Sequence, residues 1–180
     1  MKNMKLLAVL FFVAAATVAA AQPKTAIKIN LLSPVARTLN LAFERAISEN
    51  GSLQLGFYYT GAKVADVKFS GFGLTPEYRI YLSQTPAPNG FYVAPFVRYT
   101  NYTLTAEDTP DEATFTSFGG GVVVGRQWMF KDRVTFDLFI GPKYQSRDLK
   151  VKSGSNTETF DISYLNAFGI RGGLTLGIAF

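Results

Sequence analysis

The sequence contains no cysteine and no histidine. Without cysteine, the chain forms no disulfide and offers no thiol nucleophile, soft metal ligand or lipid-accepting thiol. Without histidine, it lacks the commonest general base of enzymes and the commonest metal-ligating side chain. No pair of carboxylates and no Ser–Lys pair shows the isolation that catalysis requires. The sequence therefore predicts a protein that is not an enzyme and has no cofactor and no metal site.

Long apolar runs are also scarce, and the one present lies at the N-terminus. The first five residues include two lysines, residues 6–18 are apolar, and small residues follow. A basic start, a short apolar core and a small-residue exit are the parts of a secretory signal peptide. The core is shorter than the roughly 20 residues that a membrane-spanning helix needs. We expect residues 1–21 to be removed on export and residues 22–180 to form one domain.

Charge of one sign is not in large excess. The formal net charge is +5, and it falls by two when the lysines of the leader are removed. So small a balance, in an exported chain, gives no reason to expect a nucleic-acid partner. No apolar run after the leader reaches helical spanning length, which argues against a helical membrane protein.

What the sequence does contain is a series of segments in which apolar residues alternate with polar or small ones. The longest is the last, which continues to the terminal phenylalanine with an aromatic and apolar face and a polar or small face. Strict alternation of this kind predicts strands rather than helices. The seven clear segments lie at residues 27–31, 53–59, 71–82, 91–100, 118–128, 134–145 and 160–180. The sequence therefore predicts an all-β domain.

Residues 39–47 fit two structures. They alternate as a strand would, but as a helix they stack apolar residues on one face, with Pro34 in the first turn. An eighth strand would return the chain to the side where it began, and bacterial outer-membrane barrels have even strand numbers. We therefore predict an eight-stranded antiparallel up-and-down transmembrane β-barrel. Whether residues 34–47 begin as a helix or as a strand stays open.

The connections give an independent test, because outer-membrane barrels alternate short inner turns with longer outer loops. Asn-Gly pairs, which favour tight turns, occur at residues 50–51 and 89–90. The expected inner turns are residues 49–51, 83–90 and 131–133. The expected outer loops are residues 33–38, 60–70, 103–114 and 147–158. Three of these four outer loops are longer than every inner turn, so the topology is self-consistent.

The polar face decides which side of the barrel meets lipid. A lipocalin-like soluble barrel keeps its apolar residues inside, whereas a membrane barrel inverts this arrangement. Here the polar face mixes charged residues with glycine and alanine, which suits an interior just wide enough for side chains. The apolar face is bulky and aromatic, as a lipid-facing surface should be. We expect five bases and three acids to pair in the lumen: Lys28, Glu44, Glu77, Arg79, Arg98, Asp137, Lys143 and Arg171.

Two arginines break the pattern by falling on the apolar face. Arg45 and Arg126 both lie close to expected inner turns. There an outward arginine costs only about 0–1 kcal/mol, against about 2–4 kcal/mol at the bilayer midplane. Aromatic residues on the same face are expected to form the interface girdle: Trp128, Tyr99, Tyr144 and Tyr164.

These features resemble a known class of protein. The leader, the eight alternating segments and the apolar last strand with its terminal aromatic look like small barrels of the OmpX and OmpA transmembrane-domain type. Residues 27–33 followed by 40–44 are similar to an uncharacterised family of such barrels. The resemblance covers nearly the whole mature chain and implies a Gram-negative outer-membrane location. It also implies that the barrel-assembly machinery reads the last strand through Leu176, Ile178 and Phe180.

The expected outer loops carry two charged groups. Four acidic residues in one loop fit either a divalent-cation site or a solvated loop, and the solvated loop is the better interpretation: Glu107, Asp108, Asp111 and Glu112. Lys150 and Lys152 in the last loop are placed to contact lipopolysaccharide phosphates.

The function expected from these residues is structural or interactive. A monomeric barrel with a filled, charged lumen would act through its outer loops in adhesion or envelope integrity. Its expected partners are outer-membrane lipid, lipopolysaccharide and the barrel-assembly machinery, with no nucleic acid. One alternative is a narrow pore for small solutes. A weaker alternative is a soluble secreted barrel that binds a ligand inside.

Overall fold

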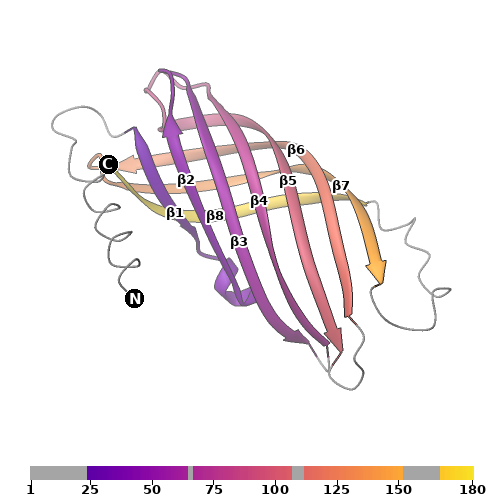
Figure 1. Ribbon diagram of the computed structural model, residues 1–180. Coiled ribbons are helices and arrows are strands. Elements are labelled where there is room, and N and C mark those ends of the chain that lie inside the picture. Colours follow the sequence, from indigo (N-terminus) through magenta and orange to yellow (C-terminus); the bar gives the residue numbers. More distant parts are fainter. Residues whose placement is uncertain (1–23, 65–66, 107–111, 152–166) are drawn as a thin grey trace, which may run out of the picture.

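In the computed structural model, eight antiparallel strands close into one barrel, as Figure 1 shows. The structure describes residues 24–64, 67–106, 112–151 and 167–180. Its elements are β1 (Thr25–Asn30), η1 (Ser33–Ala36), β2 (Thr38–Ala46), β3 (Gly51–Val64), β4 (Val67–Tyr81), β5 (Gly90–Ala106), β6 (Glu112–Phe130), β7 (Val134–Val151) and β8 (Ala167–Ala179). The predicted fold, an eight-stranded antiparallel up-and-down barrel, is confirmed. The expected signal peptide at residues 1–21 lies outside the described residues.

The first and last strands join to close the barrel. In β1, Ile27 lies opposite Ile178 of β8. The backbones of Thr25 and Phe180 exchange two hydrogen bonds, of 3.2 and 2.8 Å. Every strand therefore has a neighbour on both sides, and the backbone donors and acceptors of the wall are paired without an open edge.

The ambiguous segment after β1 contains both structures, in sequence. Ser33–Ala36 forms one short 3-10 helix, η1, with Pro34 in its first turn. The chain then enters β2, which pairs along its whole length with β3. The strand predicted at residues 39–47 is confirmed. The helix is confined to the connection because the alternation of β2 buries Glu44 and Ala46 on the inner face, which a helix would not do.

The outer ends of the strands extend further than the sequence pattern predicted. β3 continues to Val64 and β4 begins at Val67, although the sequence predicted a loop over residues 60–70. β5 and β6 still pair at Thr105 and Glu112, and β7 reaches Val151. The predicted bounds of these outer loops were therefore wrong. Backbone pairing does not require an apolar face, so the ladder continues into threonine- and lysine-rich sequence where the apolar alternation fades.

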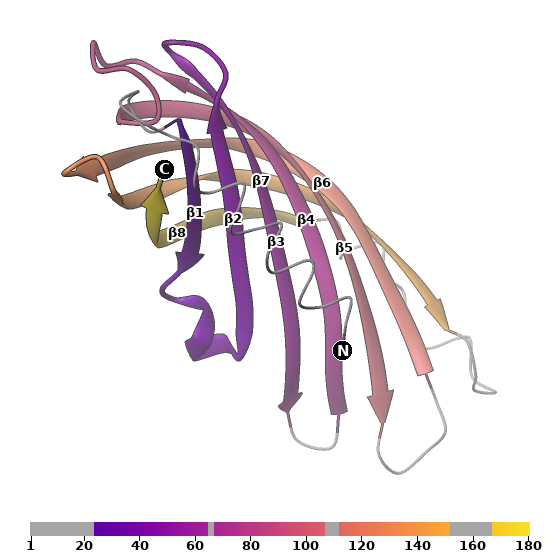
Figure 2. The ribbon, with the colours of Figure 1, turned by 60° about the vertical axis from the view of Figure 1, so that its left-hand side comes forward.

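The barrel wall has uneven height. β1 and β2 have 6 and 9 residues, whereas β5, β6 and β7 have 17, 19 and 18. Figure 2 shows η1 at the end toward which β3 and β5 run, well short of their tips. The outer mouth is therefore cut obliquely, with its low side at the β1–β2 connection. No helix among the described residues is long and apolar enough to cross a membrane.

The two faces of the wall have opposite polarity. The outward face is apolar in every strand, as a sample of its exposed side chains shows: Ile29, Phe43, Leu55, Leu74, Val97, Val124, Leu138, Ile140, Ile170 and Leu176. The inward face includes fully buried charges such as Lys28, Glu44 and Arg79. This arrangement is the inverse of a soluble barrel, in which apolar side chains fill the interior.

Candidate functional site

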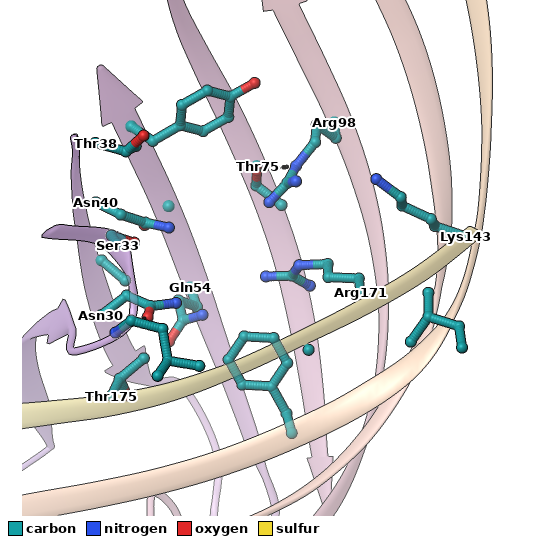
Figure 3. A pocket seen from close by; sticks show the side chains of 17 residues that line it. Asn30, Ser33, Thr38, Asn40, Gln54, Thr75, Arg98, Lys143, Arg171 and Thr175 are labelled. Carbon is teal, nitrogen blue, oxygen red and sulfur yellow. Dashed lines mark hydrogen bonds between the residues drawn. The ribbon is translucent and has the colours of Figure 1, made fainter. Parts of the chain in front are cut away.

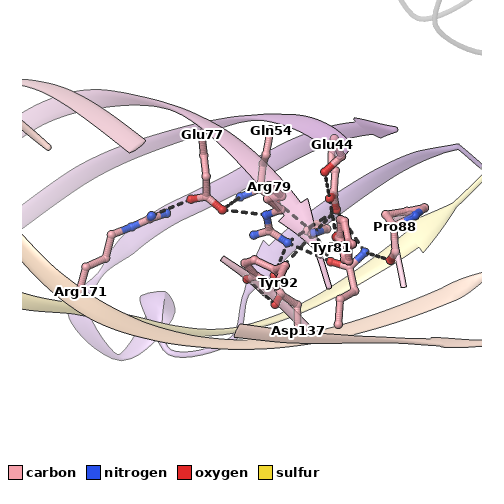
Figure 4. A network of polar contacts seen from close by, with 12 residues as sticks. Glu44, Gln54, Glu77, Arg79, Tyr81, Pro88, Tyr92, Asp137 and Arg171 are labelled. Carbon is pink, nitrogen blue, oxygen red and sulfur yellow. Dashed lines mark hydrogen bonds and ion pairs between the residues drawn. The ribbon is translucent and has the colours of Figure 1, made fainter. Parts of the chain in front are cut away.

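The lumen contains two regions at different heights. The inner half, near the turns that follow β2, β4 and β6, holds a network of buried charged and polar side chains, drawn in Figure 4. The outer half holds a cavity of about 310 Å³, drawn in Figure 3. We call the first the ion network and the second the outer cavity.

Arg79 of β4 lies at the centre of the ion network. Its Nε is 2.7 Å from Oε1 of Glu77, and its Nη1 is 2.8 Å from Oδ2 of Asp137. Nη1 also donates a 3.0 Å hydrogen bond to Oε1 of Gln127. The guanidinium carbon lies 4.3 Å from the ring centroid of Tyr92. One side chain thus links β4, β5, β6 and β7 across the lumen.

Glu44 of β2 accepts contacts from several strands. It forms an ion pair with Lys28 of β1 and accepts a hydrogen bond from the hydroxyl of Ser52. The hydroxyl of Tyr81 donates to it over 2.7 Å, and Nε2 of Gln127 donates over 3.1 Å. A carboxylate removed from water is stable only when charge and hydrogen bonds replace its hydration, and these contacts supply both.

Two further carboxylates complete the network. Asp137 of β7 accepts a 2.8 Å hydrogen bond from the hydroxyl of Tyr92. Glu77 of β4 pairs with Nη1 of Arg171 from β8 at 2.6 Å. The guanidinium of Arg171 also lies 4.3 Å from the ring centroid of Phe96. The network therefore reaches from β1 around to β8.

Charge in the network is balanced. Three cations, Lys28, Arg79 and Arg171, meet three carboxylates, Glu44, Glu77 and Asp137. All six side chains are at most 9% exposed. Buried ion pairs of this kind add little net stability compared with an apolar core, but removing one partner is costly. The network therefore fills the inner half of the lumen with groups that depend on one another.

The turn between β4 and β5 contributes to the inner end of the ion network. Pro88 is fully buried, and its carbonyl accepts a 2.6 Å hydrogen bond from Nε2 of Gln127. The backbone amide of Ala87 donates to the carbonyl of Glu49 in the neighbouring turn. A backbone hydrogen bond therefore joins two of the inner turns beneath the ion network.

The structure brings together six of the eight charged residues that the sequence placed in the lumen. Arg98 and Lys143 do not join them and line the outer cavity instead. Nε of Arg98 donates a 3.0 Å hydrogen bond to the hydroxyl of Thr75. Nζ of Lys143 donates a 2.8 Å hydrogen bond to Oε1 of Gln145. The expected pairing of five bases with three acids is thus replaced by a balanced network and a cation-lined cavity.

Several uncharged members of the network were not singled out in the sequence. Gln127, Tyr81 and Tyr92 are buried and contact the charged groups directly. Their positions in the alternating pattern place them inward, which is the signal that could have identified them. Space for the rings comes from glycine: a Cβ on Gly125 would lie 2.5 Å from Cζ of Tyr92. The small residues of the polar face therefore make room for specific large neighbours.

The residues expected in the interface girdle lie on the outward face as far as the structure describes them. Trp128 packs against Phe136 with ring centroids 5.7 Å apart, near the inner turn of β6 and β7. Tyr99 and Tyr144 are 38% and 43% exposed, and Tyr164 lies outside the described residues. The guanidinium of Arg126 lies 4.9 Å from the ring centroid of Trp128, so this outward arginine is covered by an aromatic neighbour. The girdle itself stays a prediction.

The other predicted residues are placed but not assigned a role. Leu176 and Ile178 point outward from β8, and the backbone of Phe180 pairs with Thr25. Their part in assembly stays a prediction. Of the acidic loop residues, Glu112 begins β6, and the other three lie outside the described residues. Among the residues that the structure describes, no three acidic side chains are grouped as a metal site would require.

A closed barrel with an apolar exterior and a buried, charged interior has the architecture of a transmembrane β-barrel. Residues 6–160 match the family described as Protein of unknown function (DUF3575), and the chain belongs to that family. This match agrees with the similarity to an uncharacterised family seen in the sequence. The finer resemblance to the OmpX and OmpA type stays a prediction.

Two solved structures have similar barrels. The N-terminal β-barrel domain of Pseudomonas aeruginosa OprF matches with a TM-score of 0.49 and 13% identity, covering 89% of this chain and 100% of that domain. Acinetobacter baumannii CarO matches with a TM-score of 0.46 and 12% identity, covering 89% of this chain and 99% of that one. No protein with a curated description matches the sequence.

Proposed function

We propose that the protein is an integral outer-membrane barrel that is closed to ion flow and acts structurally or as an interaction platform through its outer loops. The observation that carries this proposal is the ion network, which lies inside a wall whose outer face is apolar. The proposal is of a non-catalytic role, which the lack of histidine and cysteine supports.

The membrane location is supported by the free-energy cost that the barrel's apolar outer face would have in water. In water, a barrel of this kind would expose bulky apolar side chains on every strand and bury six charged groups. The apolar outer surface is unfavourable in water and favourable when lipid surrounds the wall. The buried charges are stabilised by one another in either case. A closed barrel is also one of the two structures that satisfy all backbone groups within a bilayer. The expected leader supports export to the outer membrane.

A closed lumen is supported by the reach of the ion network. Its charged members come from β1, β2, β4, β7 and β8, so it extends across the barrel rather than along one wall. An ion crossing this level would have to displace pairs whose members are buried and hydrogen-bonded to one another. The pore alternative therefore requires the network to open.

Single-channel recording in planar lipid bilayers tests this proposal. The refolded native protein is expected to show no steady openings. The double variant Arg79→Ala and Asp137→Ala removes a cation and an anion from the centre of the ion network and is expected to produce measurable current. Steady openings of the native protein would contradict the proposal and favour the narrow pore.

A matched control distinguishes the effect of disrupting the ion network from a general effect of removing charges. The double variant Arg45→Ala and Glu49→Ala also removes one cation and one anion, but both side chains are exposed at the inner end of the barrel. It is expected to remain as silent as the native protein. Each variant is recorded only after a gel shift between unboiled and boiled samples shows that it has closed into a barrel.

A further inference from the structure

The charged side chains that line the outer cavity are all basic in the part of the chain that the structure describes. Seventeen described residues line the cavity, and they include three cations, Arg98, Lys143 and Arg171, but no aspartate or glutamate. Figure 3 shows these cations converging from β5, β7 and β8 on the side of the cavity opposite Asn40 of β2. Hydroxyl and amide side chains complete much of the remaining wall.

Arg98 has no ion-pair partner in the described part of the chain. Its Nε is held by the hydroxyl of Thr75, and its guanidinium lies 5.4 Å from the ring centroid of Tyr58. Among the described residues, no carboxylate forms an ion pair with it and no other hydrogen-bond acceptor contacts it. Its two terminal nitrogens therefore remain available in a half-buried position, where a charge is more strongly felt than in open water.

The other two cations are already engaged, which singles out Arg98. Arg171 is paired with Glu77 at 2.6 Å, so its charge belongs to the balanced ion network below. Lys143 donates to Gln145 on the same wall of the cavity. Arg98 is therefore the cation on which the binding of a ligand would depend most.

We propose that the outer cavity binds a small oxyanion, a phosphate or carboxylate group, that enters from the outer mouth. Arg98 would form the charge-assisted contact with this ligand. The rim at Leu32 and Ser33, on the low side of the oblique mouth, provides the entrance. The volume of about 310 Å³ suits a small ligand. Because the ion network forms the floor, the cavity retains its ligand rather than conducting it.

Isothermal titration calorimetry on refolded protein tests this site directly. The detergent has a sugar headgroup, so that it carries no phosphate of its own. Inorganic phosphate is expected to bind at one saturable site, acetate more weakly at the same site because it carries less charge, and glycerol not at all. Arg98→Gln is expected to weaken phosphate binding by at least about tenfold, since one charge-assisted contact is lost.

A control variant keeps the test specific. Arg126→Gln removes the same charge from the outward face and is expected to bind phosphate as the native protein does. Unchanged binding by Arg98→Gln, or no saturable binding by native protein that still shows the gel shift of a closed barrel, would overturn the site. Either result would leave the proposed closed barrel standing.

Discussion

Replacing Glu44 by glutamine is expected to lower the free energy of unfolding by about 3–5 kcal/mol, the cost of breaking a buried ion pair from one side. The substitution keeps the shape of the side chain but removes its charge. Lys28 would lose its closest carboxylate, and Arg79 would lose a neighbour at 3.7 Å. The hydroxyl of Tyr81 would compete for the single remaining carbonyl oxygen.

The measurement is urea unfolding of protein refolded into lipid vesicles, followed by the fluorescence of the single tryptophan, Trp128. Glu49→Gln is the matched control, because Glu49 is exposed in the turn that follows β2. Its free energy of unfolding is expected to stay within about 0.5 kcal/mol of the native value. If Glu44→Gln also stays within that range, the buried ion pairs of Glu44 do not stabilise the barrel.

Replacing Ile140 by arginine is expected to cost about 2–4 kcal/mol, the cost of an outward arginine near the bilayer midplane. Ile140 is 57% exposed on β7 and lies six residues beyond Val134, where the strand begins at the inner turn. Along a tilted strand, six residues correspond to about 15 Å, close to the middle of an apolar band about 25 Å tall.

Val134→Arg is the matched control on the same strand and the same face. It lies at the inner end, where the cost of arginine falls to about 0–1 kcal/mol. Urea unfolding in vesicles is expected to separate the two variants. If both lie within about 0.5 kcal/mol of the native protein, the outward face meets water and the barrel is a soluble one.

The number and order of the strands could be predicted because the alternation that specifies a strand also specifies the face it presents. The polar face of β2 carries Glu44 and the polar face of β4 carries Glu77 and Arg79, so their approach follows once the barrel closes. What could not be predicted is the height at which each side chain meets another. That depends on the stagger between strands, which period-2 alternation leaves undetermined.

The undetermined stagger explains why the sequence analysis grouped two basic residues of the outer cavity with the ion network. Arg98 and Lys143 share the inward face with the acids, but their side chains line the outer cavity, toward the outer mouth. The ends of the outer loops were misjudged for a related reason. The sequence shows where the apolar band stops, whereas backbone pairing, as between Thr105 and Glu112, continues above it.

The most direct test of a closed barrel in the outer membrane is the location and gel mobility of the native protein. Cells are fractionated, and the outer-membrane fraction is run on SDS gels with and without boiling. We expect the protein in that fraction, with an unboiled band that migrates faster because the closed barrel resists the detergent. A protein that stays in solution when membranes are pelleted, with the same mobility before and after boiling, would contradict this expectation.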